Sequence, residues 1–206
     1  MWITKVKLAG KTALKNSFYI KFLEHIEILA VLLGFIYLFL IGQKKRLAWI
    51  FGIASSILYC YICSENNLKI QAGLQFIYVL LGALAYYQWG QKTEIAVRTI
   101  SWKKHLLALI IGCFLSFALG IIFAKNGQFL PFLDAFIAVF AIFSTFLALK
   151  AILENWIYWI ILNLLSMYLF WVQGLNFSVF LFFSYALTAV YGFYKWEKEL
   201  KDGQTT

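Results

Sequence analysis

The sequence predicts an all-α integral membrane protein with seven transmembrane helices. Of its 206 residues, 63% are hydrophobic and only 13% are charged, whereas a soluble domain carries about a quarter charged residues. The mean hydropathy is +0.81, and the apolar residues gather in blocks close to the ~20 residues that cross a bilayer as a helix. The short alternating segments typical of membrane β-barrels are not found in the sequence.

Polar and charged stretches divide the apolar sequence into seven blocks. Residues 42–46 close the first block, residues 64–67 the second, and the polar connector 90–105 the third. Residues 125–128 close the fourth block, and Pro131, the only proline, opens the fifth, since proline is tolerated in the first helical turn. The expected spans are about 26–41, 47–63, 68–89, 106–124, 131–150, 155–173 and 176–196.

The distribution of Lys and Arg predicts the orientation in the membrane, because cytoplasmic loops carry an excess of these residues. The loops after the first, third and fifth spans and the C-terminal tail are basic, whereas the loops on the opposite side carry only Lys69 and Lys125. We therefore expect the N-terminus outside and the C-terminus in the cytoplasm. The lysine-rich leader, residues 1–24, is expected as a short interfacial helix, because it lacks the features of a signal peptide.

Two parts of the chain resemble each other. The segments 76–89 and 183–196 share Phe, Tyr, Leu, Tyr and Trp at five of fourteen positions without a gap. One helix earlier, we pair Trp49 with Trp159 and Ser56 with Ser166 after a three-residue adjustment in the intervening loop. The copies lie four helices apart and point the same way, which is the parallel 3+1+3 repeat of transporters whose substrate site lies near the midplane between repeats. The expected divisions are a leader (1–24), a first three-helix repeat (25–89), a connector with linker helix (90–124), a second repeat (125–197) and a cytoplasmic tail (198–206).

The sixth span carries a stripe of polar and aromatic side chains. At ~100° per residue, Asn155, Trp156, Trp159, Asn163 and Ser166 fall within about 100° of one helix face. Asparagine costs free energy inside a bilayer unless it meets a polar partner or a water-filled cavity. The stripe therefore predicts either bridges to neighbouring helices or a ligand site.

The third span offers a second polar face, with Gln75 and Tyr78 directed toward the same interior. Trp89 and Trp196, each at a helix end, are expected as interfacial anchors. On the seventh span, Gly192 is expected to let a ligand approach closely. Amides and aromatic faces suit a heteroaromatic ring bearing a sugar, and a cationic ring would gain from cation–π attraction.

Several functions are excluded or disfavoured by what the sequence lacks. It has no Walker A, HExxH or GxSxG motif, and the two histidines, His25 and His105, lie near helix ends. The three cysteines read as buried free thiols. Glu27 and Asp134 lie close to helix starts, where capping or packing is favoured over ion coupling. We therefore expect no cofactor, metal, nucleic acid or enzymatic activity, and favour an uncoupled facilitator in contact with membrane lipid.

The motif Glu154-Asn155-Trp156-x-x-Trp159-x-x-x-Asn163 resembles the sixth-helix signature of the PnuC family of bacterial vitamin transporters. Pro131-Phe132-x-Asp134 is similar to the matching fifth-helix segment, as are Gly34, Gln75 and the Tyr87-x-Trp89 ending elsewhere. The resemblance covers about residues 25–197.

This resemblance implies a SWEET-like 3+1+3 fold, a homotrimer in the bacterial inner membrane, and uptake of nicotinamide riboside by facilitated diffusion. A cytosolic kinase would then trap the vitamin. Family members for thiamine (PnuT) and riboflavin (PnuX) share the fold. Ser55 and Gly82 stand where some nicotinamide riboside carriers have Asn, and Tyr86 stands where a Trp is common. These departures from the family pattern leave thiamine open as the substrate. A non-transporting membrane scaffold or enzyme subunit is the alternative from another class. The expected substrate-binding residues are Asn155, Trp159, Asn163 and Gln75, with Trp156 and Tyr78 as flanking walls.

Overall fold

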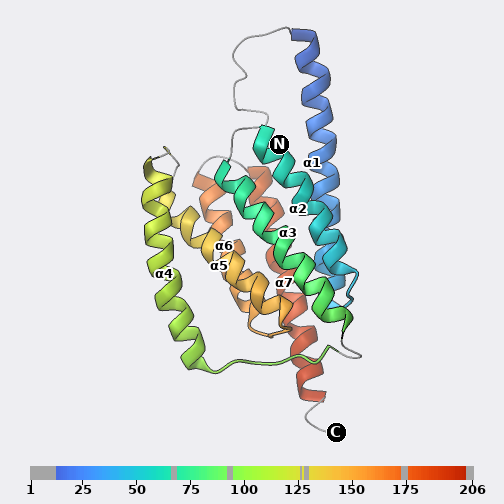
Figure 1. Ribbon diagram of the computed structural model, residues 1–206, viewed down its shortest axis with the longest axis vertical. Coiled ribbons are helices and arrows are strands. Elements are labelled where there is room, and N and C mark those ends of the chain that lie inside the picture. The colour runs from blue at the N-terminus through green and yellow to red at the C-terminus, as the bar shows by residue number, and fades with distance from the viewer. Residues whose placement is uncertain are drawn as a thin grey trace. The chain divides into compact units, whose positions relative to one another are not determined.

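The computed structural model describes residues 13–65, 69–91, 95–125, 127, 130–172 and 176–202. Within these ranges the chain forms seven helices, as the sequence predicts, and no strand beyond one isolated bridge between Arg98 and Ile152 (Figure 1). The helices are α1 (Ala13–Gly42), α2 (Ala48–Glu65), α3 (Lys69–Gly90), α4 (Trp102–Lys125), α5 (Pro131–Leu149), α6 (Asn155–Val172) and α7 (Asn176–Asp202).

Five of these helices are long and apolar enough to cross a membrane: α1 from Lys21 onward, α2, α4, α5 and α6. In the described residues, α3 and α7 fall short of that hydropathy. Helix α3 carries three glutamines, and α7 ends in a charged segment.

The helix ends differ from the expected boundaries at both termini. Helix α1 already begins at Ala13 and runs without interruption to Gly42, so the helix does not break at the expected end of the leader, residue 24. Residues 1–12 of that leader lie outside the described part. Helix α7 continues through Asp202, so the first residues of the expected tail are helical.

The chain divides into two compact units. The first comprises residues 1–41 and 45–90, and the second comprises residues 42–44 and 91–206. In the first unit α2 packs along α3, and in the second unit α4 packs on α5, α5 on α6, and α6 on α7 (Figure 1). On α4, Gly112 and Gly120 leave room for the phenyl rings of Phe140 and Phe132, which holds this helix against α5.

The turns that follow α1 and α5 have the same backbone conformation. Lys44 (φ 56°) and Ala151 (φ 54°) both adopt the left-handed conformation that glycine usually takes after a helix. The next residue of each turn donates its N–H to a carbonyl of the preceding helix: Lys45 to Leu40 at 3.0 Å and Ile152 to Leu147 at 3.0 Å. Helix α5 ends in a complete Schellman motif, since the Ala151 N–H also donates to the Ala148 carbonyl at 2.9 Å, and α1 ends with the first of these two bonds.

The helices that follow these turns keep the same spacing along the chain. The interval from Lys44 to Ala151 is repeated from Ala48, the start of α2, to Asn155, the start of α6. It is repeated again from Lys69 to Asn176, where α3 and α7 begin. Helices α2 and α6 also have equal lengths of 18 residues. Trp49 therefore corresponds to Trp156 and Ser56 to Asn163. The pairings with Trp159 and Ser166 were wrong, because the loop needs no three-residue adjustment.

Candidate functional site

The polar stripe of α6 lies mainly on the enclosed side of that helix. Four of its five residues are buried, with Asn155 at 1%, Asn163 at 5% and Ser166 at 4% exposure. Trp159 is half-buried. The opposite side of α6 exposes apolar residues such as Ile157, Ile161 and Leu164, which is the pattern of a helix between lipid and a protein interior.

The two asparagines of the stripe have different environments. The side-chain amide of Asn155 donates to the Ile152 carbonyl at 2.6 Å, so it closes the turn that precedes α6. The carboxamide of Asn163, two turns further on, makes no hydrogen bond to any residue that the structure describes. The N and O atoms of Asn163 are not among the fully enclosed, unpartnered polar atoms of the described residues, so part of its carboxamide stays accessible and a polar ligand can reach it.

Trp156 is part of the packing between α6 and α7. Its indole meets the edge of Trp196, with ring centroids 5.3 Å apart and planes at 83°. A Cβ added at Gly192 would lie 2.7 Å from three atoms of the Trp156 ring. Gly192 therefore makes room for Trp156, and the expectation that it admits a ligand was wrong.

The expectation that Trp89 and Trp196 are interfacial anchors was also wrong, because both are enclosed. Trp196 is fully buried and its indole N–H donates to the Gly42 carbonyl at 3.2 Å. Trp89 is 3% exposed and packs edge-on against Trp49, with centroids 5.4 Å apart and planes at 90°. The Tyr-x-Trp sequence near the ends of both α3 and α7 was a signal for this role, since the same packing contact in two helices needs the same residues.

The α3 residues of the predicted site belong to the first unit. Gln75 and Tyr78 are half-buried, and neither side chain makes a hydrogen bond to another described residue. The Gln75 carboxamide thus has no hydrogen bond within the described residues, whereas the Tyr78 phenol interacts electrostatically with Tyr37.

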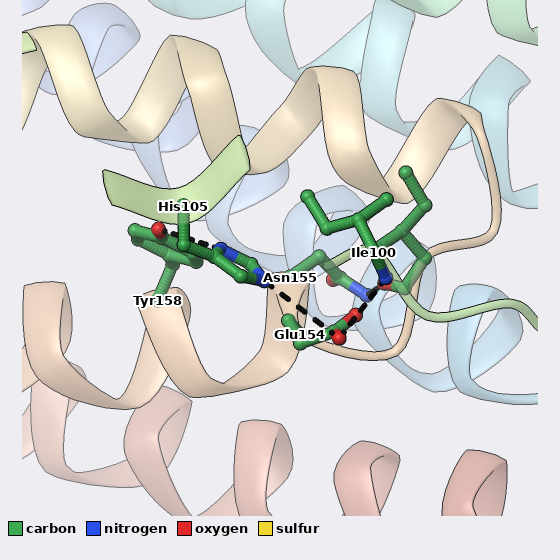
Figure 2. A network of polar contacts seen from close by, with 6 residues as sticks. Ile100, His105, Glu154, Asn155 and Tyr158 are labelled. Carbon is green, nitrogen blue, oxygen red and sulfur yellow. Dashed lines mark hydrogen bonds and ion pairs between the residues drawn. The ribbon is translucent and has the colours of Figure 1, made fainter. Parts of the chain in front are cut away.

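A polar network lies at the start of α6 (Figure 2). The Glu154 carboxylate oxygen Oε1 accepts a hydrogen bond from the Ile100 backbone N–H at 3.2 Å and lies 3.7 Å from His105 Nε2. The other ring nitrogen of His105 is 3.0 Å from the Tyr158 hydroxyl, and the two rings stack with centroids 5.8 Å apart. Sequence reasoning missed the pairing of His105 with Tyr158, because residues so far apart in the sequence give no local pattern.

Backbone hydrogen bonds add to this network. The Arg98 N–H donates to the Ala151 carbonyl at 2.9 Å, and the Leu153 N–H donates to the Arg98 carbonyl at 2.8 Å. The extended segment that leads into α4 is thus paired with the turn between α5 and α6. The described residues contain no cluster of three or more His, Cys, Asp or Glu that could hold a metal ion.

Comparison with known proteins identifies the family. The family model described as "Nicotinamide mononucleotide transporter" matches residues 24–198. The chain belongs to this family. A crystal structure of the vitamin B3 transporter PnuC has the same fold, with a TM-score of 0.71 and 21% identity over 95% of each chain. The resemblance to the PnuC family and the all-helical fold are thereby confirmed.

Curated relatives within this PnuC family differ in substrate. The riboflavin/roseoflavin transporter RibM of Streptomyces davaonensis is 22% identical over 194 residues, 89% of this chain and 91% of RibM. The nicotinamide riboside transporter PnuC of Escherichia coli is 22% identical over 183 residues, 74% of this chain and 76% of that protein. PnuC of Haemophilus influenzae is 23% identical over 180 residues, 82% and 77% of the two chains.

These findings show a vitamin transporter of the PnuC family. It is a multi-pass membrane protein, consistent with the bacterial inner membrane.

Proposed function

We propose that this member of the PnuC family takes up nicotinamide riboside by facilitated diffusion. The observation that carries the proposal is the carboxamide of Asn163, a residue only 5% exposed, which makes no hydrogen bond to a described residue and lies one turn beyond the half-buried indole of Trp159. An amide and an indole at i and i+4 share a helix face. They can hydrogen-bond a ribose or carboxamide while a cationic pyridinium ring stacks on the indole.

The six predicted residues take different roles in this proposal. Asn163 and Gln75 hydrogen-bond the substrate, Trp159 stacks on its ring, and Tyr78 forms a wall. Asn155 and Trp156 act by holding α6, since their side chains already contact Ile152 and Trp196.

The remaining features of the proposal concern assembly and energetics. Two parallel three-helix repeats, residues 25–89 and 125–197, flank the linker helix, with the N-terminus outside and the C-terminus cytoplasmic. The matched turns and the equal intervals between matched helix starts support this duplication. We further propose a homotrimer without catalytic activity, and a cytosolic kinase that phosphorylates the vitamin and so removes the need for a coupling ion.

The test is uptake of labelled vitamins by proteoliposomes that contain the purified protein. Each vesicle population encloses a kinase for one of nicotinamide riboside, thiamine or riboflavin, together with ATP. We expect nicotinamide riboside to accumulate, and no accumulation in vesicles that lack the kinase. Background uptake of all three vitamins would contradict a transport function.

Riboflavin is the second candidate, favoured by the similarity to RibM over 91% of that protein. Riboflavin has a larger, uncharged ring system, so the two vitamins should differ in how strongly they compete for one binding site. Excess unlabelled riboflavin should inhibit uptake of labelled nicotinamide riboside only weakly if nicotinamide riboside is the substrate, and strongly if the site is built for a flavin. Thiamine, left open by the sequence departures, serves as the third competitor.

A further inference from the structure

The start of α6 is anchored to the segment that leads into α4 by side chains as well as by the backbone. Glu154, the residue just before α6, accepts from the Ile100 N–H and faces His105, whose other nitrogen meets Tyr158 one turn into α6 (Figure 2). Tyr158 in turn donates its backbone N–H to the Glu154 carbonyl at 3.2 Å. The carboxylate also lies at the positive end of the α6 dipole. Glu154 therefore joins the first turn of α6 to the start of α4.

A change in the direction of α6 at this anchor would move the proposed substrate residues. Asn163 lies nine residues beyond Glu154, about 13 Å along a helix that rises 1.5 Å per residue. A tilt of α6 by about 10° at its first turn would displace Asn163 by about 2 Å, whereas binding groups must be held to within about 0.5 Å. An anchor at residue 154 can therefore control a site two turns away.

The anchor is confined to one of the two matched helices. At the matched position of the first repeat, just before α2, the chain has Leu47, which is 55% exposed and has no carboxylate to offer. The two helices begin in the same register after the same turn. The side-chain anchor is thus not required by the turn itself, and it occurs on the helix that carries Trp159 and Asn163.

We propose that Glu154 is a positioning residue for substrate binding, acting through Ile100, His105 and Tyr158 to fix the direction of α6. The inference rests on the proposed function for its effect on affinity, but the fixing of α6 is measurable without a ligand. A glutamine at position 154 keeps an oxygen that can accept from the Ile100 N–H and lie beside His105 Nε2, which is 3.7 Å from the carboxylate, whereas alanine keeps neither contact.

The first measurement is backbone hydrogen exchange of the purified, ligand-free protein over residues 155–163. Loss of the contacts to Ile100 and His105 in Glu154→Ala should raise the exchange rate there about tenfold. Glu154→Gln should stay within about threefold of the wild type. The matched control Leu47→Ala should leave α6 unchanged. Unchanged exchange of α6 in Glu154→Ala would overturn the proposal.

The second measurement is uptake of nicotinamide riboside in kinase-containing proteoliposomes. Glu154→Ala should raise KM about tenfold with Vmax within about twofold, and Glu154→Gln should restore KM, because positioning acts on affinity. An equal fall of Vmax in both variants would overturn the positioning role. If the wild type transports no vitamin while Glu154→Ala still accelerates hydrogen exchange of α6, the proposed function is contradicted and the role of Glu154 in fixing α6 is supported.

A third variant covers the case in which Glu154→Ala does not fold. Tyr158→Phe keeps the ring that stacks on His105 and removes only the hydroxyl. Exchange in the first turn of α6 should rise about threefold. A rate equal to that of the wild type would overturn the proposed network.

Discussion

The hairpins α2–α3 and α6–α7 share a scaffold but differ in the polar groups attached to it. In both, a tryptophan in the first turn of the first helix meets the edge of a tryptophan near the end of the second, at 5.4 Å and 5.3 Å. In both, the inner indole N–H, of Trp49 and of Trp156, is buried without a hydrogen bond to a described group. The common parts of the hairpins are thus apolar packing and turn geometry.

The differences lie at positions that the equal helix starts match with one another. Asn163 on α6 stands where α2 has Ser56, and Gly192 on α7 stands where α3 has Ala85. The end of α3 is held by Arg46, whose guanidinium lies 3.7 Å from the Tyr86 ring centroid and donates to the Tyr86 carbonyl at 2.9 Å.

This comparison teaches that packing and substrate recognition are separable in this chain. Whatever both hairpins keep serves the fold, and the polar residues that only one hairpin has are the candidates for function.

The largest expected effect separates Asn163 from its counterpart. Asn163→Leu should weaken nicotinamide riboside binding about 5- to 150-fold, because a polar atom of the bound ligand loses its partner at a cost of about 1–3 kcal/mol. Ser56→Ala should change binding less than about threefold. Isothermal titration of the purified variants measures both, and equal losses at the two positions would break the comparison.

The next effect concerns the close approach of α7 to Trp156. Gly192→Ala places a Cβ 2.7 Å from the Trp156 ring, so the overpacked hairpin should lose about 1–3 kcal/mol of stability. At the matched position 85 a methyl group is already accommodated, and Ala85→Gly should cost only about 0.5–1 kcal/mol. Thermal denaturation of the two variants in one detergent gives the ranking. A melting temperature of Gly192→Ala at or above the wild-type value would show that Trp156 can move aside.

The smallest effect tests the matched left-handed residues. Ala151→Gly should stabilise the protein by about 0.5–1 kcal/mol, because glycine adopts positive φ without strain. Lys44→Gly should give no such gain, since the Lys44 ammonium lies 2.6 Å from Glu199 Oε2 and 2.8 Å from the Ile95 carbonyl. Melting temperatures at low and high salt provide the measurement. A gain in melting temperature of Lys44→Gly that does not depend on salt would mean that the ion pair with Glu199 contributes nothing to stability.

The sequence by itself determined the seven helices and the enclosed side of α6. Both depend on local information: hydropathy over one span, polar residues at its ends, and the angular spacing of Asn155, Asn163 and Ser166 along one helix. The family signature around Glu154–Asn163 is local in the same sense.

Only the tertiary structure decided what the aromatic and charged residues of the helix ends do. Trp89 and Trp196 are buried by packing against Trp49 and Trp156, and no local pattern distinguishes such a tryptophan from an interfacial one. The anchor of Glu154 on Ile100 and His105 joins residues that are far apart in the sequence. Contacts at that separation depend on how helices pack, and for that reason the stripe on α6 was predictable while the residues that hold α6 in place were not.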